Sequence, residues 1–144
     1  MLEKPKKKKP VSYYSKKADK VLQELGRKKF DKCEICGANM SCLHHYYPKS
    51  SAGNLRYNWL NLIPICQGCH FRHHNGFPEI HNTVNRLRGD KWLADLKKAK
   101  MTPIYNCNTK LYYEQKEQEL KNELEKYEQR KTKRNNGRYD TESY

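Results

Sequence analysis

The sequence predicts a small zinc-stapled α+β domain with flanking helices and a disordered basic N-terminal arm. Its 144 residues suffice for one domain with tails. Only 35% of them are hydrophobic, and the mean hydropathy is -1.19, so the core must be thin and needs a cross-link such as a metal ion. Two Cys-x-x-Cys pairs, at Cys33/Cys36 and Cys66/Cys69, enclose short segments with strand and helix character.

The N-terminal part predicts a flexible arm followed by a helix. Residues 1–15 carry two prolines and the run Lys6, Lys7, Lys8 and Lys9, so we expect disorder there. Ser15 is a candidate N-cap and Gly26 a candidate helix stop. Apolar residues at helical spacing between these positions predict one buried face; they are Ala18, Val21, Leu22 and Leu25.

The middle of the chain predicts the domain proper, over residues 16–100, with a core motif at 31–75. Residues 43–47 are aromatic-rich and predict a strand that Pro48 ends, and residues 62–65 predict a second short extended segment. A helix is expected over 67–74, stopped by Asn75-Gly76. Residues 79–96 have weaker helical character, interrupted near Gly89.

The C-terminal part predicts a linker and a charged helix over 101–131, followed by a disordered tail at 132–144. Apolar residues at a loose heptad spacing mark the helix; they are Tyr113, Leu120, Leu124 and Tyr127. Glu117 can pair with Lys121 one turn later. The seam is short and polar, so we expect a solvated single helix, although it is also a candidate interface for a homodimer.

The charge distribution predicts a polyanionic partner. The formal net charge is +14, and residues 1–30 contribute most of it, with 11 Lys and Arg against 3 Asp and Glu. Lysines that neutralise phosphates release counterions, which favours nucleic acid, although the charge equally suits a solvated surface. No segment predicts a membrane span or a secretory signal, so we expect a cytoplasmic protein of a bacterial host cell, or a nuclear one in a eukaryote.

The cysteine spacing predicts a structural Zn²⁺ ion held by Cys33, Cys36, Cys66 and Cys69. A redox Cys-x-x-Cys motif is the alternative, but neither pair lies in a thioredoxin-like sequence. Four thiolates leave no open coordination position, so this zinc would support folding rather than catalysis. Cys42 and Cys107 remain, and we expect a buried thiol and a free thiol in a loop, respectively.

The histidines predict a second metal site. His44 and His45 are neighbours on the predicted strand, so their side chains point to opposite faces. His70 and His74 are four residues apart on the predicted helix and share a face, which can close a metal site with His44; His73 competes with His74 for this role. Each histidine alone is equally explained as a packed or solvated side chain, and we expect His81 at the surface.

These motifs together resemble the zinc-containing HNH nucleases, whose fold is the ββα-metal or His-Me finger. The resemblance covers about residues 31–75 and rests on the two cysteine pairs, on His44-His45-Tyr46-Tyr47-Pro48, and on Asn61-Leu62-Ile63-Pro64-Ile65 before Cys66. Over about residues 16–100 the chain is more weakly similar to the phage NinG-type (Rap) recombination nucleases, through Lys17-Ala18-Asp19-Lys20, Leu55-Arg56-Tyr57 and Trp92-Leu93.

The resemblance implies a metal-dependent endonuclease that hydrolyses phosphodiester bonds in DNA, with branched recombination intermediates as substrates in a phage or bacterial setting. It makes His45 the general base, Asn61 the residue that orients it, and His70 a ligand of the catalytic metal, with His44 and His74. Histidine ligands favour zinc, manganese, nickel or cobalt over magnesium. Basic residues predicted to contact DNA are Lys49, Arg56, Arg72 and the four lysines Lys6, Lys7, Lys8 and Lys9.

Two alternative functions stay open at this point. A non-catalytic zinc module that binds nucleic acid through the basic arm would need no histidine set. A restriction or homing-type HNH nuclease would usually append a recognition module, and the sequence predicts only a helix and tails beyond the domain.

Overall fold

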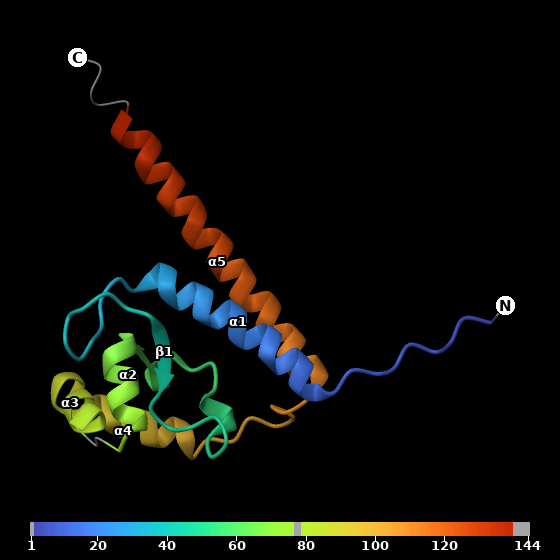
Figure 1. Cartoon of the computed structure of the whole chain (residues 1–144), viewed down its shortest axis with the longest axis horizontal. Coiled ribbons are helices and arrows are strands. Elements are labelled where there is room, and N and C mark those ends of the chain that lie inside the picture. The colour runs from blue at the N-terminus through green and yellow to red at the C-terminus, as the bar shows by residue number, and fades with distance from the viewer. Residues whose placement is uncertain (1, 77–78, 140–144) are drawn as a thin grey trace.

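The computed structural model describes residues 2–76 and 79–139, and it confirms a small α+β chain. The elements, in chain order, are α1 (Val11–Lys29), β1 (Cys42–His45), η1 (Gly53–Leu55), η2 (Trp59–Asn61), β2 (Leu62–Ile65), α2 (Gln67–His74), α3 (Glu79–Arg88), α4 (Asp90–Lys100) and α5 (Lys110–Tyr139). Strands and short helices gather into one body, and α5 extends far beyond it (Figure 1).

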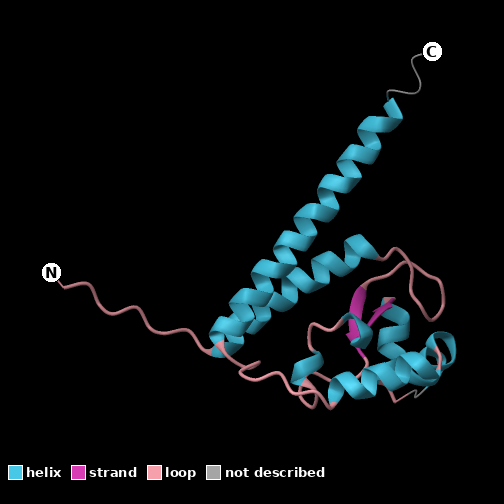
Figure 2. Ribbon diagram, turned by 180° about the vertical axis from the view of Figure 1, so that it is seen from behind, coloured by secondary structure: helices cyan, strands magenta, loops and turns pink. Residues whose placement is uncertain are grey.

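The sheet consists of β1 and β2 paired antiparallel, with Leu43 opposite Pro64 and His45 opposite Leu62. All four residues of β2 are buried, as its apolar sequence predicts. The Gln23 side chain of α1 bonds to both backbone groups of Leu43, accepting from its N–H at 2.8 Å and donating to its carbonyl at 3.0 Å. This pair of bonds fixes α1 against β1. Figure 2 shows the small sheet enclosed by helices.

Helix α1 is longer at both ends than the sequence predicts. It begins at Val11, inside the predicted arm, and Ser15 lies buried within it, its hydroxyl donating to the Ser12 carbonyl. The helix also continues past Gly26 to Lys29, so the predicted stop was wrong. Gly26 instead packs so closely against Leu43 that a Cβ atom at this position would lie 2.5 Å from the Leu43 Cδ1 atom. The predicted apolar face is confirmed as buried.

Helix α5 runs parallel to α1, and its first half packs against it (Figure 1). Tyr113 and Leu120 are buried in the core shared with α1. Glu117 is also buried and bonds to Lys121 at 2.8 Å, the predicted pair. The expectation of a solvated helix was therefore wrong for this half. The helix continues to Tyr139, so residues 132–139 of the predicted disordered tail are helical. The rest of that tail, residues 140–144, lies outside the described residues.

Helices α3 and α4 cover the other side of the sheet. They are separated by Gly89 with a φ of 86°, a left-handed conformation that suits glycine, and this confirms the predicted interruption. Val84 and Leu96 are fully buried in a core with Ile63 of β2. Arg88 ties α3 to the cysteine loop through two 2.6 Å bonds to the Glu34 carboxylate.

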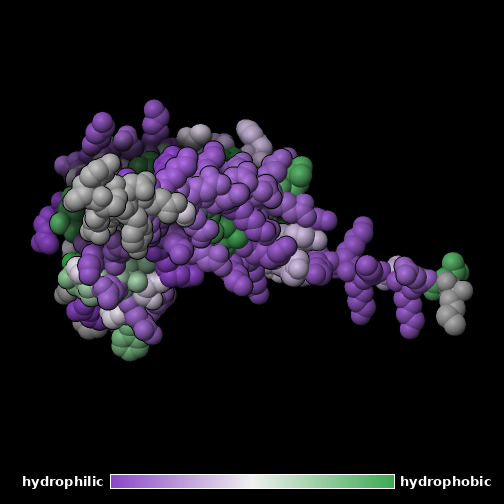
Figure 3. Space-filling model, turned by 90° about the horizontal axis from the view of Figure 1, so that it is seen from above, coloured by the Kyte–Doolittle hydropathy of each residue, from purple (hydrophilic) through white to green (hydrophobic). Residues whose placement is uncertain are grey.

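The surface is predominantly hydrophilic on the face shown in Figure 3. Residues 2–10 have no regular secondary structure and are exposed, as expected for the arm. Helices in the described residues are all too short or too polar to cross a membrane.

Candidate active site

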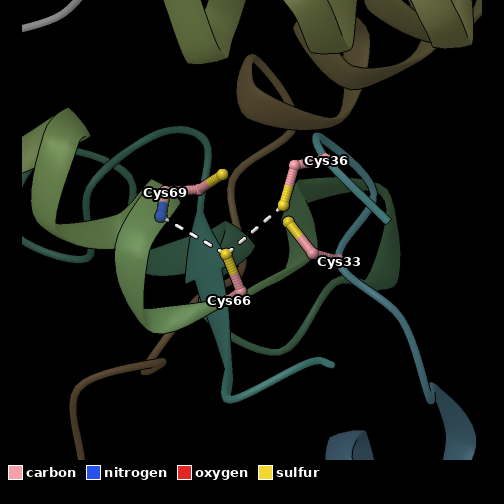
Figure 4. A group of neighbouring side chains, drawn as sticks. All are labelled: Cys33, Cys36, Cys66 and Cys69. Carbon is pink, nitrogen blue, oxygen red and sulfur yellow. Dashed lines mark hydrogen bonds between the residues drawn. The ribbon is translucent and has the colours of Figure 1, made fainter. Parts of the chain in front are cut away.

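The four cysteines of the predicted zinc site lie together. Cys33 and Cys36 come from the loop after α1, while Cys66 caps the N-terminus of α2 and Cys69 lies in its first turn (Figure 4). Their Sγ atoms lie within 4.8 Å of one another, and those of Cys36 and Cys66 are 3.5 Å apart. Tetrahedral zinc with Zn–S bonds of about 2.3 Å places sulfurs about 3.8 Å apart, so the cluster can hold a structural metal such as zinc.

The surroundings of the cysteine cluster favour the thiolate form of Cys66, whereas burial raises the pKa of Cys69 to about 12. The Cys69 backbone N–H donates to the Cys66 Sγ atom at 3.4 Å, and this bond lowers the pKa of Cys66 to about 7. Arg72 donates to the Cys69 Sγ atom at 3.2 Å. Because four thiolates around one Zn²⁺ ion leave a net charge of about -2, the Arg72 guanidinium offsets excess negative charge. Arg72, a predicted phosphate contact, thus lies beside the cysteine cluster.

All six histidines of the chain line one cleft of about 540 Å³. Strand β1 contributes two of them, α2 three and α3 one. The remaining lining residues are Gln23, Leu43, Tyr46, Pro48 and Lys49. His81, which the sequence analysis placed at the surface, is half-buried and stacks on the Tyr46 ring at 4.2 Å. The signal that could have found His81 was the concentration of histidines itself, since its spacing from α2 fits no known motif.

Within the cleft, the structure groups His44 with His73 and His81. One ring nitrogen of each lies within 4.8 Å of the others. The Nε2 atoms of His44 and His81 and the Nδ1 atom of His73 are buried without a hydrogen-bond partner. Burial, aided by the neighbouring imidazoles, lowers the pKa of His44 to about 3, so this ring is neutral at pH 7.

The predicted set of His44, His70 and His74 also lies within this cleft, and the rings of His44 and His70 have centroids 5.5 Å apart. His70 and His74 do share a helix face, as predicted, with their Nε2 atoms 2.8 Å apart. However, the ring centroids of His44 and His74 are 6.4 Å apart, whereas those of His44 and His73 are 4.4 Å apart. The reason is the orientation of α2: Cys69 points into the core, and His73, four residues later, lies on the same face and meets β1.

His45 points away from His44, as its neighbouring position on β1 predicts, but it also lines the cleft. Its Nε2–H donates to the Arg56 carbonyl at 2.9 Å. A carbonyl only accepts, so this bond fixes the proton on Nε2 and leaves a lone pair on Nδ1. Burial lowers the pKa of His45 against the opposing effect of the carbonyl, and the ring is neutral at pH 7.

Asn61 is fully buried and braces the loop that follows β1. Its Oδ1 atom accepts from the Tyr47 N–H at 2.8 Å, and its Nδ2 atom donates to the Tyr47 carbonyl at 3.1 Å. These bonds hold the backbone two residues beyond His45.

Arg56 and Lys49 both contact Asp19 of α1. Arg56 makes two bonds to the carboxylate, of 2.8 Å from Nε and 2.5 Å from Nη2, and Lys49 lies 3.3 Å away. Burial opposes ionisation of Asp19, but these cations outweigh it and lower its pKa. Asp19 was missed as a site residue; its signal was an acid between Lys17 and Lys20. The Arg56 guanidinium is thus occupied within the protein.

The arm lysines do not reach the cleft. The arm leaves the far end of α1 and extends away from the body (Figure 1). Lys9 lies over the Tyr13 ring at 3.9 Å, and three of the four lysines line a crevice with Tyr13 and Tyr14.

The described residues thus define a small α+β protein with a cysteine cluster able to bind zinc and a histidine-lined cleft. No family model matches the chain, and no solved structure matches it. The chain is 44% identical over 79 residues to a mitochondrial DNA mismatch repair protein mutS homolog of Sarcophyton glaucum. The match covers 52% of this chain but only 7% of that relative, so the similarity concerns a short segment of a much longer protein.

Proposed function

We propose that this chain is a metal-dependent DNA endonuclease of the HNH type, which hydrolyses phosphodiester bonds. One observation carries the proposal: the free Nδ1 lone pair of His45 and the unpartnered imidazoles of His44, His73 and His81 belong to one cleft. A hydrolase of this kind needs a base for water and a cation for the phosphate on the same surface.

Each residue has a defined part in this chemistry. His45 accepts a proton from water at Nδ1, while the Arg56 carbonyl keeps the ring oriented through Nε2. Asn61 holds the loop backbone beside the base. A divalent cation held by histidines would neutralise the scissile phosphate and stabilise the leaving oxygen.

DNA as the partner rests on two further observations. The net charge of +14, concentrated in the N-terminal third, suits a phosphate backbone. The relative from Sarcophyton glaucum is described as a DNA mismatch repair protein, and the shared segment favours a nucleic-acid context. Preference for branched DNA is a prediction from the resemblance to NinG-type nucleases, and cleavage of junction, flap and plain duplex substrates side by side would test it.

The decisive experiment is the His45→Ala variant in a plasmid-nicking assay with Mn²⁺ or Ni²⁺. We expect the cleavage rate to fall by about 10²-fold or more, because general-base catalysis typically contributes that much. DNA binding and the melting temperature should stay close to those of the unmodified protein. Gln115→Ala, an exposed position on α5, is the control and should cleave normally. Normal cleavage by His45→Ala would refute the assigned role.

A non-catalytic nucleic-acid-binding module is the second candidate, and the exposed basic arm favours it. It predicts salt-dependent DNA binding without nicking under any metal. A purified protein that binds plasmid and branched DNA but cuts neither after loading with Mn²⁺ or Ni²⁺ would establish this alternative.

A further inference from the structure

Three ring nitrogens in the histidine cleft are buried without a hydrogen-bond partner in the protein. They are the Nε2 atom of His44, the Nδ1 atom of His73 and the Nε2 atom of His81. Buried polar atoms in folded proteins are nearly always satisfied, and a bound ion is one explanation for an exception. Because one ring nitrogen of each of these histidines also lies within 4.8 Å of the others, a single ion can reach all three imidazoles.

We propose that one transition-metal ion is coordinated by His44, His73 and His81, with His70 and His74 outside the coordination sphere. This ion would be the metal of the proposed nuclease, and its catalytic role rests on that proposed function. Binding of the ion depends on the three imidazoles alone.

The three ligands come from three different elements. Strand β1 supplies His44, α2 supplies His73 and α3 supplies His81. The ring centroids lie 4.4 Å apart for His44 and His73, 4.8 Å for His73 and His81, and 5.8 Å for His44 and His81. An ion at their centre would therefore link both helices to the strand inside the cleft.

The ring of His81 is already held in place. It lies nearly parallel to the Tyr46 ring, at an interplanar angle of 19°, and the Tyr46 hydroxyl donates to the Asn85 side chain at 2.8 Å. The Trp92 ring packs edge-on against Tyr46 at 5.3 Å. Such support from surrounding residues fixes ligand orientation in metal sites, so little rearrangement is needed to bind an ion.

The donor set selects the kind of metal. Imidazole suits Zn²⁺, Co²⁺, Ni²⁺ and Cu²⁺, whereas Mg²⁺ prefers oxygen ligands. Among the described residues that line the cleft, none is a carboxylate. Three neutral ligands leave the full +2 charge of the ion and at least one open position, which suits a phosphate oxygen.

His70 and His74 are left out of the proposed set because their Nε2 atoms are paired with each other. Their Nε2 atoms are 2.8 Å apart and hydrogen-bond to each other, and the Nδ1 atom of His70 lies 3.7 Å from the Cys42 Sγ atom. His74 is also exposed, which makes it a suitable matched control: it is a histidine of the same cleft and the same helix as His73.

The test is calorimetric titration of Ni²⁺ into the full chain in the absence of DNA, with the protein purified to a zinc content of one ion per chain, so that only the cysteine site is filled. We expect one additional Ni²⁺ ion per chain. The variants His81→Gln and His73→Gln should weaken this binding by about tenfold or more. His74→Gln should leave it unchanged. Circular dichroism of each variant, and a retained zinc content of one per chain, separate a lost ligand from a lost fold.

Other results would overturn the assignment. Unchanged Ni²⁺ affinity in a folded His81→Gln protein would remove His81 from the ligands. Loss of binding in His74→Gln with retention in His73→Gln would favour the His44, His70 and His74 set. The ligand set and the proposed nuclease function can fail separately. Binding of Ni²⁺ without any DNA cleavage would refute only the nuclease function. DNA cleavage by a protein whose Ni²⁺ binding does not depend on His81 would refute only the ligand set.

Discussion

The proton on His45 is controlled by a chain of contacts that begins on another element. Asp19 of α1 holds the Arg56 guanidinium, and the Arg56 carbonyl accepts from the His45 Nε2–H. The side chains of Asp19 and Arg56 are 19% and 15% exposed, so their ion pair is largely shielded from solvent. The pair therefore positions the backbone on which the base depends.

Replacing Asp19 with Asn should destabilise the fold. The charged hydrogen bonds to Arg56 would be lost in a shielded setting, and we expect a cost of about 1.5–3 kcal/mol in the free energy of unfolding at pH 7. The folded-state pKa of Asp19 lies below the unfolded value of about 3.9. The stabilisation is therefore fully present above that value and is lost as the pH falls through it toward the folded-state pKa.

Urea unfolding of both proteins between pH 7 and pH 3 would measure this difference. The gap between the unmodified chain and Asp19→Asn should be largest at neutral pH and should shrink in acid. Asp95→Asn, an exposed position on α4, is the control and should show neither effect. A gap that stayed constant across the pH range would contradict the assigned ion pair.

The contact between α1 and β1 depends on a missing side chain. Gly26 lies in the interior of α1, where alanine would improve helix propensity by about 1 kcal/mol. A Cβ atom there would collide with Leu43 at 2.5 Å, and Leu43 is buried. We expect Gly26→Ala to destabilise the protein by about 1–3 kcal/mol, because overpacking outweighs propensity.

The matched control is Gly53→Ala, since no heavy atom lies within 4 Å of a Cβ at that position. It should leave the urea midpoint unchanged or raise it slightly. If Gly26→Ala proved as stable as the unmodified protein, the packing of α1 on β1 would be looser than described.

At the element level, the sequence predicted what depends on local pattern. The apolar spacing of α1, the buried run of β2 and the break at Gly89 are all present. The C-terminal end of α1 was less predictable, because Gly26 does not stop the helix but packs against Leu43, 17 residues later in the chain. Packing of α5 on α1 also depends on residues far apart in sequence, and its polar seam gave no sign of a partner.

For the candidate site, too, the sequence predicted the features that depend on local spacing but not those that depend on tertiary packing. Cysteine spacing located the four thiols, and the adjacency of His44 and His45 predicted their separate directions. The grouping of His44 with His73 and His81 depends on how α2 and α3 are oriented against β1. Periodicity alone states which residues share a helix face, but not which face meets the strand, so His70 and His74 were the natural expectation.

At the scale of the whole molecule, the described residues form three small cores rather than a single large one. One joins α1 and α5, a second lies beneath α3 and α4, and the third surrounds the cysteine cluster. The cysteine cluster connects the loop after α1 to the start of α2. A metal there would thus hold together parts that thin apolar packing cannot.

Removal of zinc should unfold the central body. Structural zinc binding contributes about 10–16 kcal/mol in small peptides, which equals or exceeds the usual stability of a domain. Cys66→Ser should therefore lose the bound zinc and show no cooperative melting of the body, as should the unmodified chain after chelation. Cys107→Ser is the control, because Cys107 lies outside the cluster, and it should retain one zinc. Normal melting of zinc-free protein would contradict the structural role.

The outer half of α5 has no partner in the described chain. Residues 128–135 are exposed throughout, so this half offers a surface for a second molecule, and the homodimer remains a prediction for measurements of mass in solution.

The gathering of every histidine into one cleft has a practical consequence for spectroscopy. Selective ¹⁵N labelling of this one amino acid would give a nuclear magnetic resonance spectrum in which each imidazole signal originates from the cleft. Tautomer, ligation and proton exchange at His45 and its neighbours could then be followed separately, with no background from the rest of the chain.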